Sequence, residues 1–238
     1  LPFDPTDIQQ AVSQTLFVKN PGNVALAVHS IIGVGDNPGD FQIDAPPTAS
    51  IAPGASAAVA VTFTPAAAGS RRAVMRVSSS DPAKPVLDVE LAGTGLTQSQ
   101  SWRNLYFQQI ENTGDAADLA DPDKDGANNL LERAFNLHPL QNGARQLDPV
   151  TGTSGLPVTS LAADRLRVEY VRRKGGSNAG MSYEPVFSSQ LDSPAGWSPT
   201  SRPETTSSIN DQWERVIAED ELSGVPNRFA RIRVIAVD

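Results

Sequence analysis

Short runs in which apolar and polar residues alternate fill the first part of the chain, residues 1–96. By this pattern, two of the runs bury Val59, Val61 and Phe63, and then Ala73, Met75 and Val77. Alternation with a period of two is typical of antiparallel strands that have one buried face. Turn-forming stretches such as NPGN and APGAS separate the runs. The spacing predicts an antiparallel β-sandwich.

After residue 100 the apolar residues recur three and four positions apart, as on one face of a helix. In SWRNLYFQQIE, residues 101–111, the side chains of Trp102, Leu105 and Tyr106 would share one helical face. The hydroxyl of Ser101 could accept a hydrogen bond from the first turn. We therefore expect a helix that begins at about Ser101.

A second, shorter helix is predicted in NLLERAFNLHP, where Pro139 ends it. Either Asn128 or Asn129 would cap its first turn. Its apolar stripe consists of Leu130, Leu131, Ala134 and Phe135. This stripe predicts that one face of the helix packs against a core.

Alternating strands return from about residue 156, and Leu166, Val168 and Tyr170 fall on one face of LRVEY. The chain is therefore predicted to be mostly β. The predicted parts are an N-terminal β-sandwich at 1–96, a helical connector at 97–140 and a small C-terminal β module at 141–238.

The loop before the second helix, DPDKDGANNLLE, satisfies the EF-hand pattern D-x-[DN]-x-[DN]-G-x5-E in full. Calcium takes six to eight oxygen ligands at about 2.3–2.6 Å, and alternate residues of a wound loop can supply them. The glycine of the pattern permits the sharp turn. The candidate metal ligands are Asp121, Asp123, Asp125, the backbone carbonyl of Ala127, Asn129 and Glu132.

Alternatives to a calcium loop stay open. An Asp-rich turn before a helix can form without an ion, and magnesium would prefer a compact octahedral site. Asp115 and Asp118 either supply a further ligand or are only solvated. The chain has no second loop of this kind. A single structural site is therefore favoured over a paired calcium sensor.

The amino-acid composition limits the classes of partner that the chain could bind. The formal net charge of −8 disfavours nucleic acid, because phosphate binding rests on an excess of Lys and Arg. The chain has no cysteine and only two histidines, which excludes thiolate chemistry and disfavours a His-rich metal site. No apolar run is long enough to span a membrane. A start at LPFDPTD, without Met or a signal peptide, suggests a piece of a longer protein.

Four separated motifs carry a resemblance to a known family. They are TLFVKNPGNVAL at 15–26, GDFQI at 39–43, the run from IAPGAS to SSSDP at 51–82, and LAGTG at 91–95. In this order they resemble the bacterial choice-of-anchor D domains, relatives of the Hydin and major-sperm-protein-like domains. The resemblance implies a non-catalytic immunoglobulin-like sandwich of an exported or surface protein. It brings no catalytic residues.

A second resemblance covers about residues 100–238. The segment AADLADPDKDGANNLLERAFNLHP at 116–139 is similar to a calcium segment near the C-terminus of many large exported bacterial proteins. Its DPDKDG run also resembles dockerin and thrombospondin type 3 repeats. In the exported proteins a β module follows, and residues 170–198 and 228–234 resemble that module. The resemblance implies calcium as the cofactor and a place outside the cell or on the bacterial cell surface.

These observations lead us to expect a non-catalytic, monomeric chain with a structural or adhesive role, in which calcium stiffens the joint. Its partners would be calcium and an unknown protein or polysaccharide at the cell surface. One alternative is a carbohydrate-binding accessory region, in which Trp197, Trp213 and Tyr183 form an exposed row. Others are a surface-sorting module and an enzyme. The enzyme requires a cleft with converging polar groups, and no nucleophile elbow is present.

Overall fold

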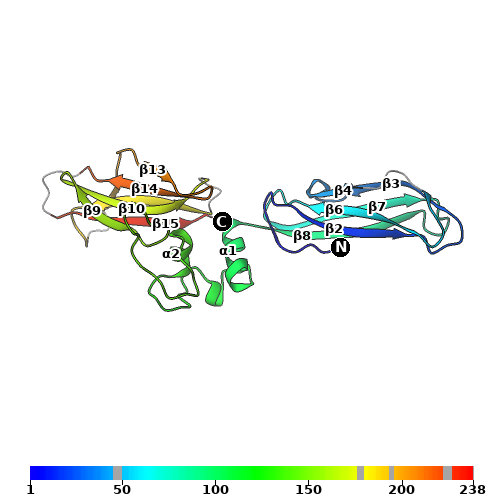
Figure 1. Ribbon diagram of the computed structural model, residues 1–238, viewed down its shortest axis with the longest axis horizontal. Coiled ribbons are helices and arrows are strands. Elements are labelled where there is room, and N and C mark those ends of the chain that lie inside the picture. The colour runs from blue at the N-terminus through cyan, green and yellow to red at the C-terminus, as the bar shows by residue number, and fades with distance from the viewer. Residues whose placement is uncertain (45–49, 176–179, 193–195, 222–226, 238) are drawn as a thin grey trace. The chain divides into compact units, whose positions relative to one another are not determined.

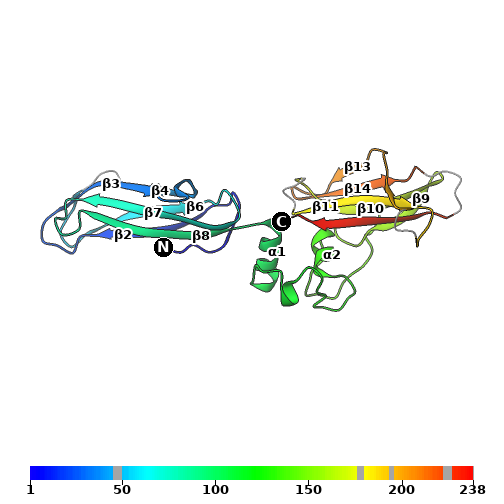
Figure 2. The same ribbon diagram turned by 180° about the vertical axis from the view of Figure 1, so that it is seen from behind.

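The computed structural model describes residues 1–44, 50–175, 180–192, 196–221 and 227–237 (Figures 1 and 2). The chain divides into two compact units, Leu1–Thr97 and Gln98–Asp238. The predicted helical connector and the strands after it thus belong to one unit. Each unit is described by itself below.

The first unit is a sandwich of two sheets. Its elements are β1 (Thr6–Asp7), β2 (Val12–Lys19), β3 (Leu26–Val34), η1 (Pro38–Asp40), β4 (Phe41–Asp44), β5 (Ser50–Ile51), β6 (Ser56–Phe63), β7 (Gly69–Ser79) and β8 (Val86–Leu96). One sheet has the order β1-β8-β7-β3-β5 and the other β2-β6-β4. All pairs are antiparallel except β1 with β8. The prediction of an antiparallel sandwich is confirmed for this unit.

The core of the first unit lies between the two sheets. Val59, Val61 and Phe63 of β6 are fully buried, as the alternation predicted. Their neighbours from β7, Ala73, Met75 and Val77, are buried in the same cluster. The rings of Phe41 and Phe63 stack with centroids 4.9 Å apart. Because the alternate residues of both strands face inward, the sheets share one apolar core.

The second unit has a helical layer and two further sheets. Its elements are α1 (Gln98–Phe107), η2 (Gly114–Ala116), α2 (Asn129–Ala134), β9 (Val158–Ala162), β10 (Arg165–Arg173), β11 (Met181–Ser188), β12 (Ser198–Pro199), β13 (Thr205–Ser208), β14 (Trp213–Glu219) and β15 (Phe229–Ala236). The sheets have the orders β13-β14-β10-β9 and β12-β11-β15. Helix α2 packs against β15 and β10 (Figure 1).

Strand β10 is buried on both of its faces. Val168 and Tyr170 lie in apolar clusters, as predicted. On the opposite face, Glu169 is also buried and pairs with the guanidinium of Arg215 in β14. The same carboxylate accepts a hydrogen bond from the backbone nitrogen of Val150, 3.0 Å away. This buried ion pair therefore fixes the segment before β9 to the sheet.

Helix α1 differs from the prediction. It begins at Gln98 rather than at Ser101, and Leu105 is 72% exposed. The buried face holds Arg103 instead, whose guanidinium lies 3.0 Å from Asp118. An ion pair between helix and loop thus sets which face turns inward. No helix in the described residues has the length and apolar character needed to cross a membrane.

The close packing of β8 in the first unit gives a testable prediction. A Cβ added at Gly95 would lie 2.9 Å from the Cβ of Pro65 and closer still to the carbonyl oxygen of Ala67. Gly95→Ala should therefore lower the free energy of unfolding by about 1–3 kcal/mol. The matched control is Gly39→Ala, where a Cβ meets nothing within 4 Å. Urea unfolding of both variants checks this, and equal stabilities would contradict the packing.

Candidate metal loop

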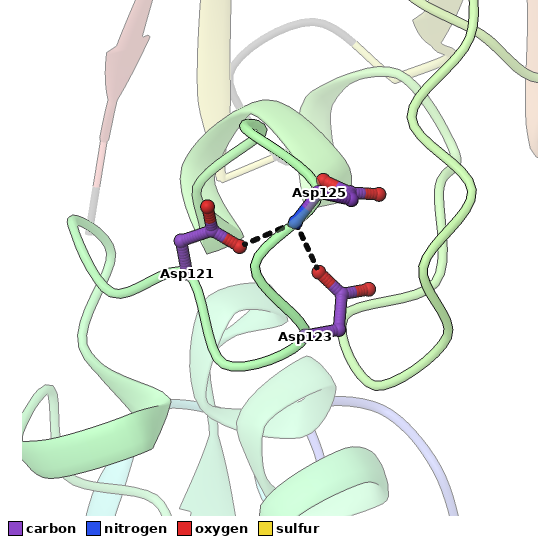
Figure 3. A group of neighbouring side chains, drawn as sticks. All are labelled: Asp121, Asp123 and Asp125. Carbon is purple, nitrogen blue, oxygen red and sulfur yellow. Dashed lines mark hydrogen bonds between the residues drawn. The ribbon is translucent and has the colours of Figure 1, made fainter.

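The loop before α2 is wound tightly by hydrogen bonds from its backbone to its own aspartates. The backbone nitrogen of Asp125 lies 3.2 Å from one carboxylate oxygen of Asp121 and 3.2 Å from one of Asp123 (Figure 3). The nitrogen of Gly126 donates to the other oxygen of Asp121 at 3.0 Å. Lys124 and Gly126 have positive φ values of 63° and 95°. The carboxylates of Asp121 and Asp123 thus both face the backbone nitrogen of Asp125 (Figure 3).

The three aspartates form a group that could hold a metal ion. Ligand atoms of Asp121, Asp123 and Asp125 all lie within 4.8 Å of one another. Hard cations such as calcium bind carboxylate oxygens of this kind. The structure thus brings together three of the residues that the sequence proposes as metal ligands.

Helix α2 carries Glu132, the remaining carboxylate of the predicted ligand set, which lies outside the group formed by the three aspartates. Asn128 caps the helix, because its side-chain oxygen accepts a hydrogen bond from the nitrogen of Leu131 at 3.1 Å. Glu132 then lies in the first turn and is fully buried. Neither of its carboxylate oxygens has a hydrogen-bond partner among the described residues, and the same holds for Oδ2 of Asp123. Three buried acceptor atoms beside this loop therefore lack a donor.

The negative charges of the loop repel one another. Burial, together with the charges of Asp123, Asp125 and Asp121, raises the pKa of Glu132 to about 7. Burial likewise raises the pKa of Asp123, and the charges of Asp125 and Asp121 add to this effect. A carboxylate whose negative form is disfavoured by its neighbours gains from a cation. The electrostatics of the loop thus fit a bound cation.

Asp125 has a second role that the sequence did not reveal. One of its oxygens, Oδ2, accepts hydrogen bonds from the backbone nitrogens of Gly143 at 2.9 Å and Ala144 at 2.5 Å. The other accepts from Ala127 at 2.9 Å. Burial opposes ionisation of Asp125, but these backbone donors lower its pKa. No local signal in QNGAR could have indicated that its backbone reaches back to the loop.

Asn129, the predicted ligand at the ninth position of the loop, is fully buried. Its side-chain nitrogen donates to the backbone carbonyls of Asp115 and Ala117, each at 2.7 Å. The side chain therefore anchors the turn around η2 to the start of α2. Its oxygen has no hydrogen-bond partner among the described residues.

Asp118 forms ion pairs with two arginines. Its two oxygens lie 3.0 Å from the guanidinium of Arg103 and 3.7 Å from that of Arg133. The sequence suggested that Asp118 is either a further metal ligand or a solvated group. The structure instead pairs it with an arginine from each of the two helices. Asp118 thus joins α1 to α2.

The aromatic residues proposed for carbohydrate binding do not form an exposed row. Trp213 is buried in the core, and Tyr183 packs against it while its hydroxyl donates to the carbonyl of Ala134 at 2.8 Å. Trp197 is partly exposed, but the guanidinium of Arg231 lies over its ring, 4.1 Å from the centroid. Each of these rings therefore contacts other residues of the chain.

A cavity of about 520 Å³ lies near the ends of β10 and β14 and is lined by Arg172, Tyr183 and Glu214 among others. Arg172 pairs with Glu214 at 2.8 Å and with Glu204 at 2.7 Å. Arg172 therefore makes ion pairs with two glutamates, and a second cation, Arg173, also lines the cavity.

Comparison with known proteins identifies the first unit. Residues 3–94 match the family model of the HYDIN/CFA65/VesB-like, Ig-like domain. The N-terminal unit is an immunoglobulin-like domain. The match does not extend into the second unit, and no curated protein matches the chain.

Solved structures show weak similarity. The PapD-like domain 7 of human CEP192 is 18% identical, with a TM-score of 0.33, over 40% of this chain and 80% of that one. SSP-19, an MSP-domain protein of Caenorhabditis elegans, is 19% identical, with a TM-score of 0.29, over 38% and 94%. The secreted serine protease VesC from Vibrio cholerae is 12% identical, with a TM-score of 0.33, over 98% and 49%. Similarity at this level assigns no activity.

The position of Asn129 gives a prediction that separates an anchor from a metal ligand. In Asn129→Asp, a carboxylate would face the carbonyls of Asp115 and Ala117, and both would lose their donor. We expect unfolding to become easier by about 1–3 kcal/mol, with chelator and with calcium alike. Asn128→Ser, which keeps a helix cap, is the matched control and should change stability little. A larger calcium response in Asn129→Asp would instead indicate a ligand.

Proposed function

We propose that the loop at residues 121–132 binds one calcium ion. Its carboxylates Asp121, Asp123, Asp125 and Glu132 and the carbonyl of Ala127 would hold the ion. The observation that carries this proposal is the burial of Glu132 with both oxygens unpartnered beside three aspartates. A bound cation would supply the charge that these oxygens lack.

The donor set favours calcium over other metals. Every proposed ligand atom is an oxygen, which suits calcium and magnesium better than zinc or copper. A glutamate that can offer two oxygens favours the larger, flexible coordination of calcium. The loop also matches the EF-hand pattern at each of its defined positions.

The ion would consolidate the second unit. Hydrogen bonds link the loop and the start of α2 to the turn around η2 and to the segment at 143–144, and all of these belong to that unit. We therefore assign the expected stiffening to the joint between helical layer and sheets. An ion that binds only the folded state, present at a hundredfold excess over its Kd, would add about 2.7 kcal/mol of stability. Such a staple matters because the chain has no cysteine.

The biological role that fits best is a structural or adhesive one. We infer a non-catalytic region of a large exported bacterial protein, outside the cell or at its surface. The immunoglobulin-like N-terminal unit supports this inference. The partner would be a protein or polysaccharide at the cell surface.

A carbohydrate-binding accessory region and a surface-sorting module are two of the alternatives to this role. A carbohydrate-binding accessory region is less favoured, because Trp213 and Tyr183 are used in the core. A surface-sorting module is tested by deleting residues 156–238 from the full-length protein. Correct placement of the shortened protein would argue against sorting.

The unpartnered Glu132 predicts that neutralising its side chain lowers the unfolding temperature only when calcium is present. Glu132→Gln removes a buried negative charge from the carboxylate group. In chelator the variant should therefore unfold at the same or a higher temperature than the wild type. In calcium it should unfold at a lower temperature, because the ion loses its charged ligand.

Thermal unfolding in both conditions tests this prediction. Glu111→Gln, which neutralises an exposed carboxylate of the same unit, is the matched control and should respond to calcium as the wild type does. If Glu132→Gln kept the full calcium response, this residue would not be a ligand.

A further inference from the structure

The segment after α2 contains the only Asn–Gly pair in the sequence, Asn142–Gly143. Both residues are exposed and lie outside regular secondary structure. Asparagine followed by glycine is chemically labile. The backbone nitrogen of the glycine can attack the side-chain amide, and no Cβ hinders its approach. The position of this nitrogen therefore decides whether Asn142 is stable.

In the folded chain this nitrogen is held by the candidate metal loop. Gly143 donates its N–H to Oδ2 of Asp125 at 2.9 Å, and Ala144 donates to the same oxygen at 2.5 Å. Attack would require the Gly143 nitrogen to lose its proton and turn toward Cγ of Asn142. A hydrogen bond to a carboxylate opposes both changes, because it holds the proton and places negative charge beside it.

We propose that Asn142 is a deamidation site that Asp125 protects, and that filling the metal loop strengthens the protection. In the reaction, the deprotonated nitrogen of Gly143 bonds to Cγ of Asn142. The bond from Cγ to Nδ2 breaks, and ammonia leaves with the proton. Water then opens the cyclic imide at either carbonyl, which yields aspartate or isoaspartate. Water is the only co-reactant.

The link to calcium rests on the proposed function. Without the ion, repulsion among Asp121, Asp123, Asp125 and Glu132 would favour local opening of the loop, which frees the nitrogen of Gly143. The product adds a negative charge next to the loop. Its isoaspartate form also lengthens the backbone by a methylene group and moves Gly143 away from Asp125. Deamidation would therefore weaken the site that had prevented it.

The test follows conversion of Asn142 by peptide mass spectrometry, with isoaspartate methyltransferase labelling to distinguish the products. The whole chain is incubated in mildly alkaline buffer with calcium, with EDTA, and in urea as an unprotected reference. Asp125→Ala and Asp125→Asn are incubated in EDTA. The Asn side chain keeps an oxygen that can accept from Gly143, whereas Ala keeps none. Asn142→Gln assigns the signal to this position.

We expect Asp125→Ala to convert about tenfold faster than the wild type in EDTA, which corresponds to one lost hydrogen bond to a charged group. Asp125→Asn should convert more slowly than Asp125→Ala. Calcium should slow the wild type further. Equal rates in Asp125→Ala and Asp125→Asn, or a wild-type rate equal to that in urea, would overturn the inference.

The incubation with calcium distinguishes a failure of this inference from a failure of the proposed function. If calcium raises the unfolding midpoint but does not slow conversion, the loop binds the ion and the metal-linked protection is wrong. If calcium changes neither, the proposed function fails. The comparison of the two Asp125 variants in EDTA then decides by itself whether Asp125 protects Asn142.

Discussion

Repulsion among four carboxylates constrains the helical layer of the second unit. Asp121, Asp123 and Asp125 converge because the backbone of the loop winds around them. Helix α2 then adds Glu132, fully buried and without a hydrogen-bond partner among the described residues. An uncompensated buried charge costs several kcal/mol, so the group must take up a proton or a cation. The cation that we propose would let all four residues stay ionised.

The constraint extends from the loop toward the sheets through backbone hydrogen bonds. Asp125 accepts hydrogen bonds from Gly143 and Ala144. A few residues later the backbone nitrogen of Leu147 donates to the carbonyl of Leu156, whose own nitrogen donates to the carbonyl of Arg145. The end of α2 is also anchored to this segment, because the carbonyl of Phe135 accepts a hydrogen bond from the backbone nitrogen of Gly155 at 3.0 Å. The segment between α2 and β9 has little regular structure of its own. Its order depends on these anchors.

Periodicity predicted much of this architecture because each strand of the first unit has one buried face. The alternation around Val59 and Met75 therefore indicated the core correctly. The sequence left the cap of α2 open between Asn128 and Asn129, and the structure shows Asn128. Periodicity failed where polar groups are buried in pairs. Arg103 of α1 and Glu169 of β10 read as solvent-facing residues, yet each is buried against a charged partner far away in sequence. A one-dimensional pattern does not show such partners.

The candidate site was predictable to the same extent. The spacing of Asp121, Asp123 and Asp125 is local, so the sequence alone could indicate that these three side chains lie near one another. The anchoring of Asn129 to the turn around η2 depends on chain reversals that the spacing does not encode. The same is true of the donors that Gly143 and Ala144 offer to Asp125.

The most direct test of the account is isothermal titration of calcium into the chelator-treated chain, beside an Asp123→Ala variant. The account predicts one saturable site per chain in the wild type and none in the variant. Extracellular calcium modules bind with a Kd of about 10⁻⁴–10⁻³ M, and we expect the affinity to fall in or below this range. Absence of saturable binding at millimolar calcium, or equal binding by the variant, would contradict a calcium site in this loop.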